Sequence, residues 1–243
     1  MTQVSVIVPF WNAGQYVLDA LRSIAAQDVP VHEILVLDQG GNSSSQVFPE
    51  QALSEFPDLK IHQIGRTSPA VARNLGLEKV TGDVVAFLDD DDLWPVGKLQ
   101  RQLSRLGGYD VVGGLVRAFG DKESPNACGH DRVMYNVGAY IYRREALEQL
   151  GGFNIDFVHG EDVDLTFRAA SELRLLVLRS VELYYRRREG SLTTDIHGGI
   201  VGHEAALLAA VRRAAARGCL LKSIEQFLDT DGYNGSTGTG LYC

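Results

Sequence analysis

The sequence predicts an α/β protein built on a mainly parallel, Rossmann-like central sheet. Short and almost wholly apolar runs of strand length recur at residues 4–9, 34–37 and 84–88, as expected of strands that are buried on both faces. Segments whose apolar residues recur every three or four positions lie between them, which is typical of amphipathic helices. Strands that alternate with helices form parallel sheets through right-handed crossovers.

Strands and helices alternate through the first half of the chain. Ser68 is a suitable N-cap and Pro69 occupies the first helical position, which proline favours, so a helix is expected to begin there. We expect strands at residues 4–9, 34–37, 60–64 and 84–88, and helices at residues 14–27, 49–56 and 69–78.

The second half of the chain has a less regular pattern. Gly151 and Gly152 follow a short helical segment and suit a helix C-cap, and acidic residues open the next helix, where the helix dipole favours them. We expect strands at residues 109–117, 137–142, 175–178 and 183–187, and helices at residues 144–150, 161–171 and 203–228, the last interrupted near Gly218.

Composition and charge disfavour several classes of partner. The 243 residues carry a net charge of −8, so the basic face of a nucleic-acid-binding protein is not expected. Three widely spaced cysteines, Cys128, Cys219 and Cys243, form no Cys-x-x-Cys pair and indicate a reducing compartment. No leader pattern opens the chain, and no apolar run approaches the ~18 residues of a membrane span. We therefore expect a cytoplasmic protein without a membrane span.

Four consecutive carboxylates, Asp89 to Asp92, follow the apolar run at residues 84–88 and are called the acidic run below. Adjacent like charges raise one another's pKa values unless a cation or several hydrogen-bond donors lie among them. Ligands of open α/β sheets bind beyond the carboxyl ends of the strands, and carboxylate oxygens suit Mg²⁺ or Mn²⁺ better than zinc. The acidic run therefore predicts a divalent-metal site, with a solvated loop as the alternative.

The glycine-rich fingerprints of dinucleotide-binding proteins and of P-loop kinases are absent after the first predicted strand. Both classes of protein lose support accordingly.

Taken together, the motifs resemble those of family 2 glycosyltransferases of GT-A fold. The resemblance extends over about residues 3–192 and rests on residues 4–12, 33–38, 72–77, 81–92, 151–153 and 160–164. It implies an inverting transfer of a sugar from a nucleoside diphosphate donor, with Mn²⁺ or Mg²⁺ bridging the diphosphate. Two alternatives stay open, an inactive nucleotide-sugar-binding protein and a nucleotidyltransferase.

The resemblance also implies a division of the chain. Residues 1–200 are expected to form the GT-A domain, with a nucleotide-sugar half at about residues 1–108 and an acceptor half at about residues 109–200. A helical extension is expected at residues 201–229. Residues 230–243 are rich in Gly, Ser and Thr and are expected to form a flexible tail.

The implied donor site combines residues from several motifs. Asp91, helped by Asp89, is the expected metal ligand by this resemblance. Most family members have a second Asp where this chain has Gln39, and a His where it has Arg188. An amide both donates and accepts hydrogen bonds, so a uridine donor is favoured without excluding guanosine or thymidine. The expected donor-binding residues are Pro9, Phe10, Asn12, Asp38, Gln39, Arg73, Asp89, Asp90, Arg186 and Arg188.

Asp162 is the catalytic base that the resemblance implies, with Glu161 beside it. An inverting transferase needs a base that takes the acceptor's proton, and the charges of Glu161 and Asp164 are expected to raise the pKa of Asp162. We place Trp94 and Asp164 on the acceptor side and Trp11 in the core. The acceptor itself stays open among a glycan, a lipid-linked saccharide, a peptide and a small molecule.

The pattern around Leu207, Leu208 and Val211, with Arg212 and Arg213 nearby, has two interpretations. Apolar and basic residues on one helix are typical of a helix that lies on a membrane surface. The second interpretation, which we favour, is that this helix docks on the main domain.

Overall fold

The structure, a computed structural model, describes residues 2–40, 54–120, 131–187 and 196–218, with the backbone alone for 196–200. Its strands join in one seven-stranded sheet of order β3-β2-β1-β4-β6-β5-β7. The strands are β1 (Val4–Phe10), β2 (Glu33–Asp38), β3 (Leu59–Gln63), β4 (Val84–Phe87), β5 (Val111–Phe119), β6 (Ile141–Arg143) and β7 (Leu175–Arg186). The described helices are α1 (Tyr16–Ala25), α4 (Pro69–Leu77), α5 (Lys98–Arg105), α6 (Arg144–Leu150), α7 (Glu161–Glu172) and α8 (Ile196–Ala216), with 3₁₀ turns η1 (Leu106–Gly108) and η2 (Val137–Ala139).

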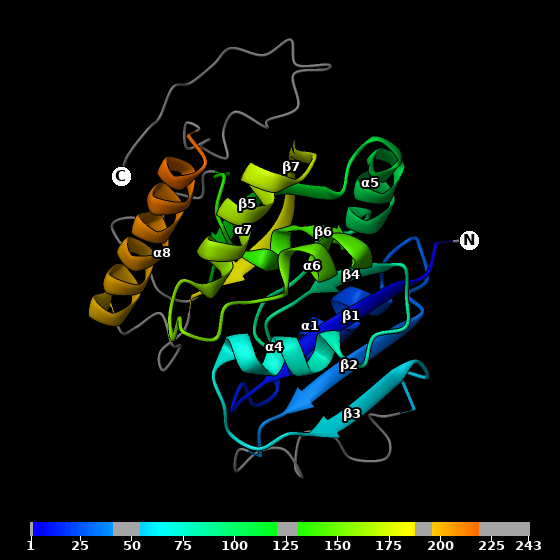
Figure 1. Cartoon of the computed structure of the whole chain (residues 1–243). Coiled ribbons are helices and arrows are strands. Elements are labelled where there is room, and N and C mark those ends of the chain that lie inside the picture. The colour runs from blue at the N-terminus through cyan, green and yellow to red at the C-terminus, as the bar shows by residue number, and fades with distance from the viewer. Residues whose placement is uncertain (1, 41–53, 121–130, 188–195, 219–243) are drawn as a thin grey trace.

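The prediction of a mainly parallel sheet is confirmed. Strands β1 to β4 are mutually parallel where they pair, and β5 pairs with β7 in parallel. The short strand β6 is antiparallel to both of its neighbours, β4 and β5. Because β1, β2 and β4 run in one direction, their carboxyl ends meet at one edge of the sheet, which Figure 1 shows at the ends of the blue arrows.

The strands at the centre of the sheet form where their sequence is apolar throughout. Every residue of β1, β2 and β4 is buried. Helix α1 packs against them through Val17, Leu21 and Ile24, and the ring of Phe87 meets the edges of Tyr142 and Phe153. The apolar runs are therefore continuous because both faces of these strands are covered.

Two strand predictions were wrong in detail. Residues 137–142 form η2 followed by β6, because the side chain of Asn136 accepts a hydrogen bond from the Gly138 amide (2.8 Å) and starts a turn. The two strands expected at residues 175–178 and 183–187 are the single strand β7. The polar residues Arg179 and Ser180 lie inside this strand, and β5 stays paired with β7 through register shifts beside Leu115.

One helix, α5, was not predicted. Two of its three buried side chains, Lys98 and Gln102, are polar. The amide of Gln102 donates to the carbonyls of Val112 and Ala139, at 3.1 and 2.8 Å, which satisfies the buried side chain. Most of the helix expected at residues 49–56 lies outside the described residues.

The C-terminal helix docks on the main domain, as we expected. Ala206 and Ala210 of α8 pack against Val163 and Phe167 of α7, and Figure 1 shows α8 at the edge of the molecule beside α7. Gly202 lies so close to the backbone of His159 that a Cβ there would overlap it. Helix α8 begins at Ile196, so the expected boundary after residue 200 falls inside a helix, and the predicted part beyond residue 218 lies outside the described residues.

Among the described residues, we find no helix with the length and apolar character that crossing a membrane requires.

We expect Gly113→Ala to destabilise the fold by about 1–3 kcal/mol, because the added methyl group would overlap the buried ring of Tyr140. The matched control is Gly107→Ala, since a Cβ at Gly107 has no described atom within 4 Å. Chemical denaturation of both variants measures the difference, and equal midpoints would contradict this packing.

Candidate active site

The carboxyl ends of β1, β2 and β4 bring three loops together. Phe10 at the end of β1 pairs in register with Asp38 at the end of β2. Just beyond β1, the amide of Trp11 donates a hydrogen bond to Asp90 Oδ2 (2.7 Å). The acidic run therefore begins at the edge of the sheet where α/β proteins bind ligands.

The four carboxylates of the acidic run differ in exposure. The side chain of Asp89 is 33% exposed, whereas Asp90 and Asp91 are 9% and 8% exposed and Asp92 is fully buried. Asp92 accepts a hydrogen bond from the amide of Arg186 (2.7 Å), which links the run to the end of β7. Burial and the charges of Asp89 and Asp91 raise the pKa of Asp92. Asp92 is thus the most buried of the four carboxylates and contacts the end of β7.

Arg73 on α4 connects the acidic run to the start of α7. Its Nη2 lies 2.7 Å from Asp89 Oδ1, and its Nη1 lies 2.6 Å from Glu161 Oε1. The guanidinium is 5% exposed and stacks on the ring of Phe153, 5.4 Å from its centre. Asp90, the next residue of the acidic run, accepts from the Trp11 amide. Burial alone would lower the pKa of Arg73, but the charges of Asp89, Glu161 and Asp162 outweigh it and raise this pKa, so the bridge stays charged.

Asp162 is the second residue of α7, after Glu161 and the N-cap Gly160, whose φ of 84° is one that glycine adopts without strain. Its Oδ1 accepts a hydrogen bond from the Val163 amide (2.8 Å). Burial and then the negative charge of Glu161 raise the pKa of Asp162 to about 7, although Arg73 opposes the shift. The expected direction of this shift agrees with the structure, but the leading cause is burial.

The placement of Asp164 on the acceptor side was wrong. Its side chain is fully buried and accepts a hydrogen bond from Arg168 Nε (2.8 Å). Arg213 of α8 brings its Nη2 to 2.8 Å from the other carboxylate oxygen. Since residues two apart on a helix point to different sides, Asp162 and Asp164 cannot both face the same site at the start of α7. Asp164 binds α8 to α7 instead.

The side of the site beyond β2 contains polar groups that already have partners. Asp38 is 1% exposed and accepts from the Gly40 amide (2.9 Å) and from Gln63 Nε2 (2.6 Å). The side-chain oxygen Oε1 of Gln39 accepts a hydrogen bond from the Thr67 amide (3.1 Å). Gln39 is thereby oriented with its acceptor occupied, which favours its NH₂ group for contact with a ligand.

The first loop contributes through its backbone. The side chain of Phe10 is 1% exposed and belongs to the core, while its carbonyl accepts from the Gln39 amide (3.1 Å). Pro9 is buried within β1. Asn12 is exposed with a φ of 55°, a left-handed conformation that asparagine tolerates. Of these three expected residues, only Asn12 presents its side chain to solvent.

Arg186 stabilises the acidic run from the opposite side. Its Nε donates to the Asp91 carbonyl (2.6 Å), and its guanidinium stacks on the rings of Tyr16 and Phe119 at 4.4 and 4.6 Å. The side chain is 15% exposed. Arg188, the other expected cation of this segment, lies outside the described residues.

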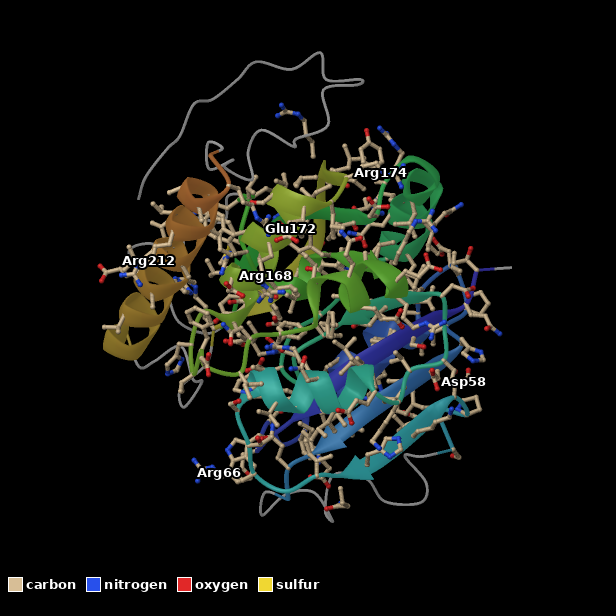
Figure 2. All side chains as sticks on the ribbon, in the orientation of Figure 1. Asp58, Arg66, Arg168, Glu172, Arg174 and Arg212 are labelled. Atoms are coloured by element: carbon tan, nitrogen blue, oxygen red, sulfur yellow. The ribbon has the colours of Figure 1, made fainter. Side chains whose placement is uncertain are left out.

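The two tryptophans are placed opposite to our expectation. Trp94 is 3% exposed and its indole N–H donates to the Gly138 carbonyl (3.2 Å), so it is a core residue. Trp11 is partly exposed, and the guanidinium of Arg66 stacks 4.9 Å from its ring centre. Figure 2 shows Arg66 at the edge of the molecule near the ends of β2 and β3. We did not expect Arg66 at this site. Its only sequence signal is a position shortly after a strand, which many other residues share.

The donor set of the acidic run fits a hard divalent cation. Carboxylate oxygens gather there, and burial followed by the charges of Asp89 and Asp91 raises the pKa of Asp92. Within the described residues, no group of three or more His, Cys, Asp or Glu side chains is arranged to hold a metal ion. A cation at the acidic run would therefore need further ligands from water or from a bound substrate.

A family model described as Glycosyl transferase family 2 matches residues 5–161. The chain belongs to this family. The match includes β1, the acidic run and Glu161, and it ends one residue before Asp162.

Curated relatives of this family 2 chain are glycosyltransferases. AglE of Haloferax volcanii is 27% identical over 185 residues, which cover 68% of this chain and 60% of AglE. WfgD of Escherichia coli, named UDP-Glc:alpha-D-GlcNAc-diphosphoundecaprenol beta-1,3-glucosyltransferase, is 27% identical over 175 residues, 65% of this chain and 66% of WfgD. The chain therefore spans no more than about two thirds of the length of these relatives.

Solved structures identify the fold of the family 2 chain as GT-A. Residues 1–349 of S. aureus TarS in complex with UDP-GlcNAc give a TM-score of 0.64 at 25% identity, covering 79% of this chain and 61% of that one. The mannosyltransferase PcManGT from Pyrobaculum calidifontis, in complex with GDP-Man and Mn2+, gives 0.65 at 23% identity, covering 90% and 76%. The likeness to PcManGT is evidence for the fold alone.

We expect Arg73→Met to destabilise the family 2 chain by about 3–5 kcal/mol, because it leaves the buried carboxylate of Glu161 without its cation. Arg22→Met is the control, since Arg22 makes an exposed ion pair with Glu55 and should cost no more than about 1 kcal/mol. Urea denaturation at neutral pH compares them. A loss at Arg73 no larger than that at Arg22 would show that the bridge does not stabilise the fold.

Proposed function

We propose that the chain is an inverting, metal-dependent glycosyltransferase whose general base is Asp162. The observation that carries this proposal is the place of Asp162, which is partly exposed at the start of α7 and has its pKa raised to about 7. Arg73 binds both Glu161, at the start of α7, and Asp89, and so connects α7 to the acidic run. Family membership and the nucleotide-sugar complexes of the structural neighbours support a sugar nucleotide as donor.

The proposed reaction needs a base on the acceptor side and a stabilised leaving group on the donor side. Asp162 takes the proton of the acceptor hydroxyl as its oxygen forms a bond to the anomeric carbon. The bond from that carbon to the diphosphate breaks at the same time, and attack from the opposite face inverts the anomeric configuration. A carboxylate with a pKa near 7 accepts this proton more readily than an ordinary aspartate at neutral pH.

We assign the leaving-group side to the acidic run. Asp91 is the proposed protein ligand of Mn²⁺ or Mg²⁺, with Asp89 helping from its bridge to Arg73. A cation held there would supply Lewis-acid stabilisation of the diphosphate leaving group. Arg186 holds the carbonyl of Asp91 and thereby fixes the backbone of this ligand. The Mn2+ complex of the neighbour PcManGT supports a divalent cation in this fold.

We propose a uridine diphosphate sugar as donor. The Asp38 carboxylate can accept the imide N–H of uracil, and the NH₂ group of Gln39 can donate to a neighbouring carbonyl oxygen. The TarS complex with UDP-GlcNAc supports this assignment, whereas the GDP-Man complex of PcManGT keeps a guanosine donor as the competing outcome. The acceptor is an open question, for which the lipid-linked saccharide in the name of WfgD is one candidate.

We expect Asp162→Asn to lower UDP release from UDP-GlcNAc in the presence of Mn²⁺ by about 10²–10⁴-fold. A base works only when ionised, so wild-type activity should fall about tenfold per pH unit below a pKa of about 7 and level off above it. The control is the exposed Asp156→Asn in the same loop region. Full activity in Asp162→Asn would rule out this base.

We expect Asp91→Asn to remove the dependence of nucleotide binding on Mn²⁺. Calorimetric titration with UDP, with and without the metal, measures this, because a lost carboxylate weakens a hard-cation site. Asp58→Asn is the control, since Asp58 is exposed at the start of β3, away from the acidic run (Figure 2). Unchanged metal-dependent binding in Asp91→Asn would reject Asp91 as the ligand.

The same assays separate the alternative functions. Nucleotide-sugar binding without any turnover, unaffected by Asp162→Asn, would identify an inactive binding protein. Release of pyrophosphate from a nucleoside triphosphate would identify a nucleotidyltransferase. A stronger response to GDP-Man than to UDP-GlcNAc would replace the proposed uridine donor with a guanosine one.

A further inference from the structure

Helix α8 has an apolar face that the described part of the chain leaves uncovered. Its inner side packs on α7 through Ala206 and Ala210. Seven large apolar side chains are exposed in the described residues, and four of them lie within eleven residues of α8. We call this the outer face of α8, and its large apolar members are Val201 (51% exposed), Leu207 (44%), Leu208 (49%) and Val211 (46%).

Single exposed apolar residues are common on proteins, whereas a contiguous group indicates a contact surface. Residues 201, 204, 208, 211 and 212 are separated by steps of three, four or one, so they share one side of the helix. The group on α8 is therefore contiguous.

Two opposite charges flank Leu208 on the outer face. Glu204 and Arg212 are both exposed, and each lies four residues from Leu208. They are eight residues apart, or about 12 Å along the helix, so they cannot pair with each other. Figure 2 shows Arg212 pointing away from the body of the protein. In the part of the chain that the structure describes, neither charge takes part in an ion pair.

Two other arginines, Arg213 within α8 and Arg217 just after its end, differ in this respect. Arg213 lies 2.8 Å from the buried Asp164, and Arg217 lies 2.9 Å from Glu172. These two cations hold α8 to α7. The charges of the outer face are thus distinct from those that dock the helix.

We propose that the outer face of α8 is the contact surface of a two-fold symmetric dimer of this chain. A two-fold axis beside Leu208 makes the two α8 helices antiparallel and brings the two Leu208 side chains together. Glu204 of each copy then faces Arg212 of the other, since both lie four residues from the axis. Such an interface is isologous, so one complementary pair occurs twice.

The apolar residues complement one another in the same arrangement. Val201 and Ala215 are each seven residues from Leu208, and Ala205 and Val211 are each three residues from it. Each valine of one copy therefore faces an alanine of the other. Pairing a large residue with a small one allows two helices to approach closely.

A second copy fits the outer face better than a lipid surface does. Glu204 lies within this face, and the chain carries a net charge of −8, so an anionic membrane would repel both. A membrane surface would also leave the matched spacing of Glu204 and Arg212 without a role. Charge complementarity of this kind sets partner choice and register at protein interfaces.

Sedimentation velocity of the full chain over a range of concentrations tests the dimer. We expect a concentration-dependent monomer–dimer equilibrium for the wild type and monomer alone for Leu208→Glu, which places two carboxylates at the axis. The control is Val96→Glu, because Val96 is 67% exposed but lies before α5, far from α8 in Figure 1, and its dimer should persist. Circular dichroism and melting temperature check that each variant folds.

Charge reversal gives a second and sharper test. Glu204→Arg alone and Arg212→Glu alone each place like charges opposite each other twice, so each should weaken the dimer by about tenfold. The double variant Glu204→Arg/Arg212→Glu should restore the wild-type dissociation constant. A merely apolar contact would not show this rescue.

Three outcomes would overturn the proposal. One is a wild-type chain that stays monomeric at all concentrations, and another is a dimer that Leu208→Glu leaves intact. The third is a monomeric wild type that binds vesicles of phosphatidylglycerol and phosphatidylcholine and loses this binding in Leu208→Glu, which would make the outer face a membrane surface. Failure of the double reversal to restore the dimer would reject the antiparallel register.

Discussion

The bridge that Arg73 forms between Asp89 and Glu161 is the interaction on which the arrangement of the site depends. It joins three segments that lie far apart in the chain, namely α4, the end of β4 and the start of α7. A planar guanidinium suits this role because its two Nη groups bind separate carboxylates at fixed angles. A lysine would keep the charge but could not fix the direction of both partners.

The same bridge explains why neighbouring carboxylates have different properties. Glu161 and Asp89 form ion pairs with Arg73, whereas Asp162 feels the charge of Arg73 without such a contact. Burial and the charge of Glu161 then raise the pKa of Asp162, so one residue of the pair is structural and the next is suited to proton transfer. Glu161, which we had placed with the catalytic residues, makes a direct ion pair with Arg73.

The elements that could be predicted from the sequence are those that depend on the residues within them or next to them. Strands β1, β2 and β4 are apolar throughout because both faces are buried, and α4 begins at Ser68 and Pro69, whose capping chemistry is visible in the sequence. Helix α5 escaped prediction because tertiary hydrogen bonds, such as those of Gln102, satisfy its polar buried face.

Long-range partners in the site could not be predicted for a related reason. The types of residue at Asp89, Arg73 and Glu161 indicated a charged site, but Arg73 and Glu161 are 88 positions apart. Nothing in their local sequence shows that they meet. Asp164 lies close to Glu161 in the sequence, and we therefore grouped it with the acceptor side. This was wrong, because Asp164 pairs with Arg213 on a separate helix.

The contact between Arg213 and Asp164 bears on how large an independently folding unit this protein requires. The family model ends at residue 161, and Asp164 lies just beyond that limit, inside the helix that begins with Glu161. A protein shortened to remove α8 would keep every element of the sheet but would retain a fully buried carboxylate that had lost one of its two cations. The smallest useful version for crystallisation or redesign therefore extends through α8, even though that helix contributes no strand to the fold.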